Sequence, residues 1–538
     1  MTLVGRACTR RKPPHPLALL AVLCFGVAAQ TSLAAGGDEP DLEAGRRMYR
    51  EGIRPSGEPL TAIVTGDVPI LGTQLSCQSC HGRSGMGAAE AAYIVPAIAG
   101  RFLFAPSPQP ARPAYDPESL ARALREGVDP AGRALDPLMP RYHLTDQEVS
   151  ALAAYLAILS AGNSPGVDDE VIRFAAVIAG NVDTREREAV LAVLRTYVAE
   201  KNRQTRLESE RWDRQYAPAS KLPTLFREWV LDEWTLTDPS DGWAEQLETR
   251  YQHNPVFALL SGISTGPWAP IGRFCERHEI PCLFPITDMP DAEANDFFTL
   301  YFSQGLELEA DLIANHIASH PVHTVIQVSC GAAPARAAAA LRSALAQQGV
   351  KLENLEMNCD GSFPEAELSA RMAAAPNAAT VLWLRRDQLS TIKQSLPLGR
   401  IYVSSTLLDR DLSAQLVTAP GPVFAAHPYR LPGERDPALR RFAVWAKTRG
   451  IEIRYPRQQA ETFFACFAAN DVVRHLRRYF VRDYLLDMLD HAQGLAAYVP
   501  IHPRPTLGPG QRFLTKGGYI LPVVEGHPDT KHATFILP

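Results

Sequence analysis

The 538-residue sequence predicts a multidomain protein, with an all-α domain at residues 40–160 and a larger α/β module at residues 171–538. Two observations support this division. In the first region apolar residues recur at helical spacing between capping residues. In the second region short apolar runs alternate with helical patterns, and this βαβ order predicts parallel sheets covered by helices. The small and polar residues 161–170, AGNSPGVDDE, form the predicted linker.

The composition is that of a globular protein and excludes some partners. Hydrophobic residues make up 46% of the chain and charged residues 21%, which is enough apolar material for several cores. The formal net charge is −5, so the chain lacks the basic footprint that nucleic-acid binding requires. No apolar run reaches the roughly 18 residues that a membrane span needs. We therefore expect no nucleic-acid partner and no transmembrane segment after signal cleavage.

The first 34 residues have the features of a secretory signal peptide. A basic segment at 6–12 precedes the apolar run LALLAVLCFGVAA at 17–29, and small residues follow it. Sec export is favoured over two alternatives. Arg10-Arg11 lacks the apolar residues expected after a twin-arginine pair, and Cys24 follows a large leucine rather than the small residue typical of a lipoprotein. The sequence therefore predicts export to the periplasm of a Gram-negative type of cell.

Residues 77–81, CQSCH, form the C-x-x-C-H pattern that attaches a c-type haem. Two thiols at this spacing reach the two vinyl groups of one haem, and the adjacent histidine meets the iron from the same side. A zinc site would need a second Cys/His pair nearby, and a thioredoxin-like pair would not precede a glycine-rich run. The pattern predicts one covalently bound haem c on Cys77 and Cys80, with His81 as an iron ligand.

Around this motif, residues 41–160 resemble a class I cytochrome c. LEAGRRMY at 42–49 resembles the N-terminal helix of that family, and DPE at 116–118 starts a second helix. A last apolar-periodic helix runs from 145 to 159. The stretch 52–76 is an insertion relative to the family, and we expect a surface loop or a short hairpin there.

The resemblance also implies the axial ligands and their support. In this family the segment M-P-x-Y carries the sixth iron ligand, which here is Met139. Pro96 resembles the proline whose carbonyl accepts the other N–H of the iron-bound histidine. Met48, Met86 and His143 are the alternative ligands. An iron held by His and Met has no open position for substrate, which favours one-electron transfer with a periplasmic dehydrogenase or oxidase as redox partner.

The α/β module is predicted from the order of its elements. Apolar runs of strand length are each followed by a segment with helical spacing. Such units join neighbouring parallel strands through helices on the faces of the sheet. The predicted strands are 171–179, 255–261, 280–286, 322–328, 380–384 and 400–405, and the predicted helices are 185–202, 268–278, 306–319 and 334–348.

Two stretches of this module, 257–290 and 301–318, resemble the type I periplasmic binding proteins, the branched-chain amino acid receptor group of ABC transporters. The resemblance spans about residues 171–525 and implies two lobes. In that family the turns after two strands of the first lobe bind ligand through hydroxyls and backbone N–H groups. The positions implied here are Ser264, Thr265, Thr287 and Asp288.

Departures from the family leave the role of the module open. The usual Tyr-Gly pair is replaced by SCGAAP at 329–334. The acidic residue that would pair a ligand ammonium is not evident either, since RRD at 385–387 follows the strand 380–384. The ligand is then acidic or otherwise different, or the module docks a redox partner instead.

Two alternative functions of the whole protein remain. One alternative is a solute receptor of an ABC-type transporter with an accessory haem domain. Another is a hydrolase, because GISTG at 262–266 matches the G-x-S-x-G elbow with Ser264 as nucleophile, although no His-Gly-Gly precedes it. A carrier or binding protein is favoured over an enzyme.

Seven cysteines remain after the signal, and in an exported chain they are expected to be paired, ligated or deliberately free. Cys275 and Cys282 flank a short helix-to-strand turn, so a disulfide between them is one option. Cys330 and Cys359 end two strands of one βαβ unit and are a second option. Cys466 is then left over as a small buried residue.

Overall fold

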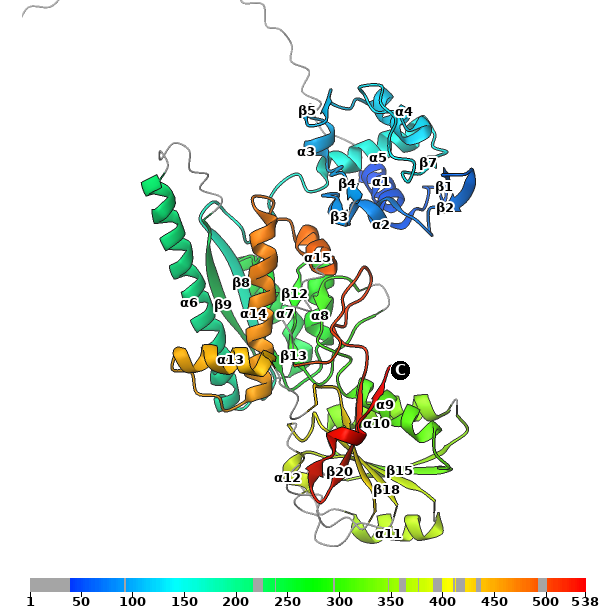
Figure 1. Ribbon diagram of the computed structural model, residues 1–538, viewed down its shortest axis with the longest axis vertical. Helices are drawn as coiled ribbons and strands as arrows, with labels where there is room; N and C mark the ends of the chain where they lie inside the picture. The colour runs from blue at the N-terminus through cyan, green and yellow to red at the C-terminus, as the bar shows by residue number, and fades with distance from the viewer. Residues whose placement is uncertain are drawn as a thin grey trace, which may run out of the picture. The chain divides into compact units, whose positions relative to one another are not determined.

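The structure is a computed structural model that describes most of the chain (Figure 1). The predicted signal peptide at 1–34 lies outside the described residues. Within the described part, every helix is too short or too polar to cross a bilayer. The described residues are 39–90, 93–215, 226–237, 239–293, 296–346, 348–357, 364–375, 377–389, 399–409, 412, 421–431, 437–491 and 501–538.

The first domain is built on two helices that cross closely, α1 (Glu39–Glu51) and α5 (Asp146–Ile158). Gly45 permits this contact, because a Cβ at that position would lie 2.2 Å from the carbonyl oxygen of Ala151. The predicted helix starts are correct: Asp116 caps α4 (Pro117–Glu126), and Thr145 caps α5. The short helices α2 (Cys77–His81) and α3 (Gly100–Leu103) complete the helical set.

The insertion at 52–76 contains a hairpin of β1 (Thr61–Val64) and β2 (Val68–Leu71). A third strand, β7 (Arg141–Tyr142), pairs with β1 and so ties the hairpin to the segment that follows Met139. The expected hairpin therefore forms. The remaining strands of the domain are two small pairs, β3 (Ala88–Glu90) with β4 (Tyr93–Val95) and β5 (Ser107–Pro108) with β6 (Ala111–Arg112).

The first lobe of the α/β module contains a parallel sheet with β8 (Val171–Ala179) at its centre. Strand β9 (Glu228–Leu236), which the sequence analysis missed, pairs along the whole length of β8. The predicted strands 255–261 and 280–286 are shorter in the structure, and each is followed after a break by a second short strand. The observed pieces are β10 (Ala258–Leu260) and β11 (Ile263–Ser264), β12 (Cys282–Leu283) and β13 (Ile286–Thr287), with β14 (Thr299–Leu300) beside β12.

The break between β10 and β11 has a steric cause. Ser261 and Gly262 both have positive φ angles, +55° and +97°. A Cβ at Gly262 would lie 2.5 Å from the carbonyl oxygen of Val177, so glycine is required for the close approach to β8. The chain then resumes as β11, which pairs with β8 and β13 and ends at Ser264.

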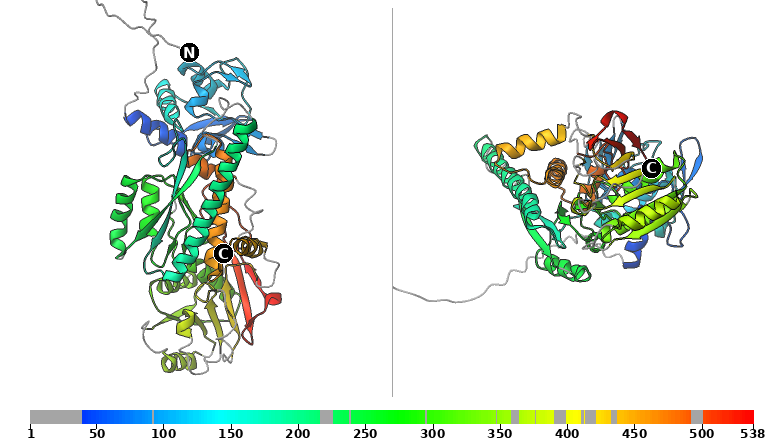
Figure 2. Two further views of the ribbon diagram at one scale, coloured as in Figure 1. Left: turned by 90° about the vertical axis from the view of Figure 1, so that its left-hand side faces the viewer. Right: turned by 90° about the horizontal axis from the view of Figure 1, so that it is seen from below.

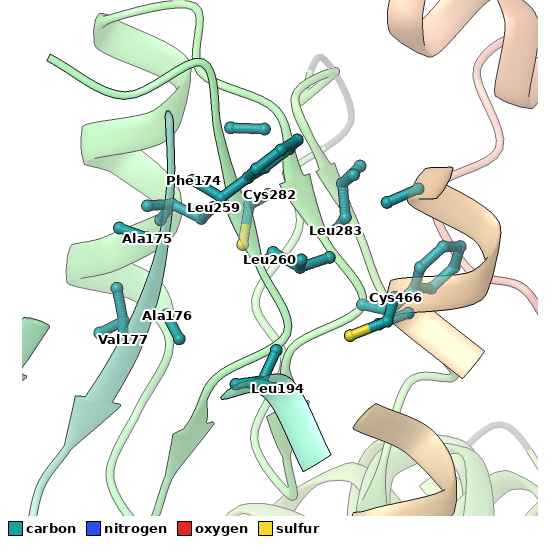
Figure 3. Packing of buried hydrophobic residues seen from close by; sticks show 14 of the residues in the cluster. Phe174, Ala175, Ala176, Val177, Leu194, Leu259, Leu260, Cys282, Leu283 and Cys466 are labelled. Atoms are coloured by element: carbon teal, nitrogen blue, oxygen red, sulfur yellow. The ribbon is translucent and has the colours of Figure 1, made fainter. Parts of the chain in front are cut away.

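Helices cover both faces of this sheet (Figure 2). The long helices α6 (Thr184–Gln215) and α14 (Pro456–Leu476) pack on one face and on each other, and α7 (Trp243–His253) and α8 (Ala269–Arg277) pack on the other. Figure 3 shows side chains of β8, β10 and β12 in the core together with Cys466 of α14. The lobe also contains η3 (Ser240–Gly242), α13 (Pro437–Thr448) and α15 (Arg482–Asp490).

The second lobe contains a sheet of five parallel strands followed by antiparallel ones. Successive residues of β15 alternate between two cores, with Val325 in one and Ile326 in the other. The strand order is β16 (Lys351–Glu356), β15 (Thr324–Ser329), β17 (Ala379–Trp383), β18 (Arg400–Ser404), β19 (Val423–His427), β20 (Gly518–Val524) and β21 (His527–Pro528), with β22 (Thr534–Ile536) also on β20. The helical elements are α9 (Leu306–Ala318), α10 (Ala332–Ala346), α11 (Glu365–Ala374), α12 (Arg386–Leu389) and η5 (Thr530–His532).

The chain passes between the two lobes several times, in agreement with the predicted two-lobed architecture. The chain leaves the first lobe after β14, builds the second lobe, returns as α13 to α15, and crosses again to add β20. Two crossing segments lie side by side: Tyr301 N–H donates to the carbonyl of Arg512, and Leu514 N–H donates to the carbonyl of Tyr301. The rings of Tyr301 and Phe513 stack with centroids 5.6 Å apart.

The cysteines of the module differ in state. Cys275 and Cys282 are buried neighbours, but both are free thiols, so the first disulfide option is not formed in the structure. Cys330 is disulfide-bonded, and its predicted partner Cys359 lies outside the described residues. Cys466 is a buried free thiol in the core, as expected.

Candidate functional site

The haem motif lies on the short helix α2. The helix spans Cys77 to His81, so the two thiols and the imidazole sit within little more than one turn. Gly82 ends the helix with φ +75°, a conformation that favours glycine. Its carbonyl oxygen accepts a hydrogen bond of 2.7 Å from the buried hydroxyl of Tyr49 on α1. The helix is therefore fixed to the domain core directly behind the motif.

The imidazole of His81 is oriented by the loop that contains Pro96. Nδ1 of His81 lies 2.9 Å from the carbonyl oxygen of Pro96. A carbonyl only accepts, so Nδ1 carries the proton and Nε2 is left for the iron. Burial lowers the pKa of His81, which keeps the ring in the neutral form that binds metals.

Met139 is half-buried and packs against the same hydrophobic cluster as Cys77. Its backbone is held in a turn, since the Met139 N–H donates to the carbonyl of Asp136. Met48 is fully buried in the core of α1, and His143 is exposed, with Nδ1 3.4 Å from the Thr61 hydroxyl. Two thiols, a neutral histidine and a half-buried thioether are a donor set that fits a haem c, which would supply one-electron chemistry there.

The loop after the motif is bonded to two carboxylates of α15. Asp487 accepts hydrogen bonds from the backbone N–H groups of Arg83 at 3.1 Å and Ser84 at 2.9 Å. Asp483 accepts from the side chains of Arg83 at 3.2 Å and Arg50 at 3.1 Å. Burial raises the pKa of both carboxyls, and the facing arginines oppose that shift for Asp483. The residues next to the haem motif are thus held by the C-terminal part of the α/β module.

A small cavity of about 20 Å³, room for one water molecule, lies where the chain crosses between the lobes. Arg457 of α14 lines it and is surrounded by carboxylates at 3.7 Å from Asp288, 3.7 Å from Asp409 and 3.8 Å from Glu461. All three distances exceed that of a hydrogen bond. Glu461 also lies 3.0 Å from Nε2 of the buried His502.

Two buried polar atoms at this cavity have no hydrogen-bond partner in the described part of the chain. They are Nε of Arg457, a donor, and Oε2 of Glu461, an acceptor. Both residues are buried, and 11% of the Arg457 side chain and 3% of the Glu461 side chain are exposed. An unsatisfied buried polar group is costly, so these two atoms mark a position where a further polar group is expected.

Of the four predicted ligand residues, two line the cavity and two do not. Thr287 and Asp288 line the cavity. Ser264 lies beside Thr287 in the sheet, but its hydroxyl accepts from Gly266 N–H at 3.0 Å and donates to the Gly266 carbonyl at 3.1 Å. Thr265 is exposed, and neither Ser264 nor Thr265 lines the cavity.

The hydrolase alternative gains no support from this geometry. In the described part of the chain, the hydroxyl of Ser264 bonds to Gly266 and not to a histidine that would act as its base.

The sequence analysis did not predict the residues of α14 that line the cavity. They could not be linked to Thr287 from the sequence, because α14 lies more than 150 residues after it. One signal was present: Arg457 and Glu461 stand four residues apart in the helix that follows Tyr455, so they share one face of it.

Behind the cavity, Glu309 of α9 is completely buried. It accepts hydrogen bonds from the backbone N–H of Thr406 at 3.1 Å and from the Thr406 hydroxyl at 2.6 Å, and that hydroxyl is 2.8 Å from the hydroxyl of Tyr429. Burial raises the pKa of Glu309 to about 8, so the carboxyl is protonated at neutral pH.

This burial makes the stability of the protein pH-dependent. The carboxyl keeps its proton in the folded state while the unfolded chain loses it above about pH 4.5, so the free energy of unfolding falls between about pH 4.5 and 8, by several kcal/mol. Glu309→Gln, which has a neutral side chain at every pH, is expected to remove this fall. Urea unfolding at pH 5 and pH 8 measures it, with Glu307→Gln on the same helix as control. Equal pH slopes for the wild type and Glu309→Gln would contradict the assignment.

Residues 71–160 match the family model of cytochrome c. The first domain is therefore a cytochrome c domain, from a family that binds haem c covalently. The matched range includes the whole C-x-x-C-H motif, the Met139 segment and α5. The full sequence matches no curated protein.

The α/β module is similar in fold to solved binding proteins. A branched-chain amino acid ABC transporter protein from Thermus thermophilus with bound valine is 13% identical with a TM-score of 0.47, over 67% of this chain and 95% of that one. A branched-chain amino acid transporter substrate-binding protein from Streptococcus pneumoniae in complex with isoleucine is 9% identical with a TM-score of 0.46, over 69% and 100%. A leucine-binding protein from Thermotoga maritima is 10% identical with a TM-score of 0.45, over 68% and 99%. At such low sequence identity, the ligands bound by these proteins are not assigned to this chain.

Proposed function

We propose that this protein is an exported one-electron carrier with a single haem c, joined to a module that binds a small molecule between its lobes. The observation that carries the first half is the haem motif on α2, with His81 oriented by Pro96 through its Nδ1. Met139 packs against the same hydrophobic cluster as Cys77 and, with His81, would hold the haem iron. A haem held by two protein side chains would supply one-electron transfer rather than substrate binding.

Spectroscopy of the purified full chain tests the carrier function. We expect a haem content of one per chain, a low-spin spectrum in both oxidation states, and a potentiometric titration that follows a single one-electron curve. We also expect negligible peroxidase activity, because hydrogen peroxide finds no open iron position. A high-spin resting iron, or more than one haem per chain, would contradict the proposal.

The orphaned atoms of Arg457 and Glu461 support the second half of the proposal. Both residues are buried and line a cavity between the lobes, which favours a small ligand over a docked protein. A ligand that binds only the folded protein at a hundredfold excess over its Kd stabilises the fold by about 2.7 kcal/mol, which a thermal-shift screen of amino acids, carboxylates, amides and alcohols detects. If no compound in the screen raised the melting temperature and an exported dehydrogenase bound tightly, the module would be a docking module instead.

A further inference from the structure

Resting on the carrier half of the proposed function, we infer that Asp487 of α15 is a positioning residue for the haem, through which the α/β module lowers the reduction potential of the cytochrome domain. Asp487 binds the backbone N–H groups of Arg83 at 3.1 Å and Ser84 at 2.9 Å, two and three positions after His81. Oδ1 accepts one hydrogen bond and Oδ2 accepts the other, so both oxygens of the carboxylate are used. An amide side chain has a single accepting oxygen and cannot replace it.

The carboxylate of Asp487 lies directly against the backbone that follows the predicted iron ligand. A Cβ at Gly82 would lie 2.6 Å from Oδ2 of Asp487, so no side chain separates the carboxylate from this backbone. Asp487 is 8% exposed and Ser84 is fully buried, so water and salt screen this charge poorly. A negative charge is therefore held in a buried position beside the residue next to His81.

Helix α15 holds Asp487 in place because both ends of the helix are bonded to the α/β module. At its start, the buried Arg482 donates to the carbonyl oxygen of Phe257 at 3.0 Å. At its end, Asp490 accepts two hydrogen bonds, of 2.9 and 2.8 Å, from Arg512 in the segment that crosses between the lobes. The position of the carboxylate is thus fixed by the module and not by the cytochrome domain.

The other charges at this contact balance one another and leave Asp487 as the excess. Arg50 lies 3.1 Å from Asp483 and 3.4 Å from Glu279, and Arg83 lies 3.2 Å and 3.6 Å from the same two carboxylates. The two N–H groups that bind Asp487 carry no net charge. Oxidation adds one positive charge at a haem iron, so a fixed carboxylate nearby favours the oxidised state and lowers the reduction potential.

The test is a potentiometric titration of the full-length haem protein at pH 8, followed by optical spectroscopy. Asp487→Asn removes the charge, and we expect the ratio of reduced to oxidised protein at the wild-type midpoint to rise about threefold or more. Asp487→Glu keeps the charge and should have a potential closer to that of the wild type. Arg83→Gln removes a positive charge but keeps the backbone N–H, so its potential should shift downwards. Shifts of the same sign in Asp487→Asn and Arg83→Gln would indicate a loosened structure and overturn the electrostatic role.

Asp146→Asn is the matched control for the loss of one negative charge. The side chain of Asp146, at the start of α5, is 94% exposed, so water screens its charge and the potential should stay unchanged. Amide hydrogen exchange of Arg83 and Ser84 adds a readout that does not depend on the iron. These two amides should exchange faster in Asp487→Asn than in the wild type and in Asp146→Asn. Equal exchange in all three proteins would show that the hydrogen bonds are absent and overturn the inference.

The outcomes separate this inference from the proposed function. A low-spin protein with the same potential in the wild type and Asp487→Asn would overturn the role of Asp487 and leave the electron carrier intact. A wild-type protein without a low-spin, one-electron couple would overturn both. If Asp487→Asn does not retain haem, Arg83→Gln decides the matter, because an unchanged or raised potential in that variant would overturn the inference.

Discussion

Replacing Cys77 and Cys80 together by serine is expected to abolish covalent haem attachment. Each thioether needs a cysteine sulfur, and α2 presents these two residues one turn apart beside His81. The wild-type protein should keep its haem through denaturation and acid-acetone extraction, whereas the double variant should release any haem that it still holds. Haem staining of a denaturing gel and the pyridine haemochrome spectrum measure the difference.

A control for this experiment lies in the core of the first lobe. Cys466→Ala removes a buried free thiol far along the chain and should leave the haem stain unchanged. A single replacement, Cys77→Ser or Cys80→Ser, should leave one thioether and an altered haemochrome band. Covalent haem that survives in the double variant would disprove the attachment site.

Met139→Ala is expected to convert a low-spin iron into a partly high-spin one that binds carbon monoxide. The thioether of methionine favours the reduced iron, so its loss should also lower the reduction potential. The packing loss is moderate because Met139 is only half-buried, and the domain should remain folded. Optical spectroscopy of the reduced protein with and without carbon monoxide, together with a potentiometric titration, gives all three readouts.

The alternatives to Met139 are separable by the same measurements. Met86→Ala in the loop after the motif and His143→Ala on the exposed segment should both leave the spectrum and the potential unchanged. Met48 is a poor control, because it is fully buried and its truncation costs about 2–5 kcal/mol of stability. An unchanged spectrum in Met139→Ala, with a changed one in another variant, would transfer the ligand role to that residue.

The first domain could be predicted from the sequence because its signals are local. The haem motif spans five residues, and the caps of α4 and α5 each depend on side chains three residues apart, as in the pair of Thr145 and Glu148. The match to the cytochrome c family covers the same region. The order of helices and parallel strands in the α/β module was also predictable from its periodicity, and the two-lobed fold is confirmed.

What could not be predicted depends on contacts distant in sequence. The break at Ser261–Gly262 exists because the backbone passes close to Val177 of another strand, and no local pattern shows that. Strand β9 was missed because charged residues interrupt its apolar alternation, EWVLDEWTL. The cavity was missed for a similar reason: Thr287 and Asp288 were recognised from their turn, but their partners on α14 are supplied after the whole second lobe.

The hydrogen bonds from Asp487 to the loop after the haem motif determine how late in folding this loop can be covered. The carboxylate and the backbone N–H groups that it binds are 404 and 403 positions apart in the sequence. The chain is synthesised from its N-terminus, so the motif exists before the carboxylate does. Until α15 is present, Arg83 and Ser84 lack the acceptor that binds their N–H groups in the folded protein. The covering of this loop is therefore a late step of folding, which depends on the C-terminal part of the α/β module.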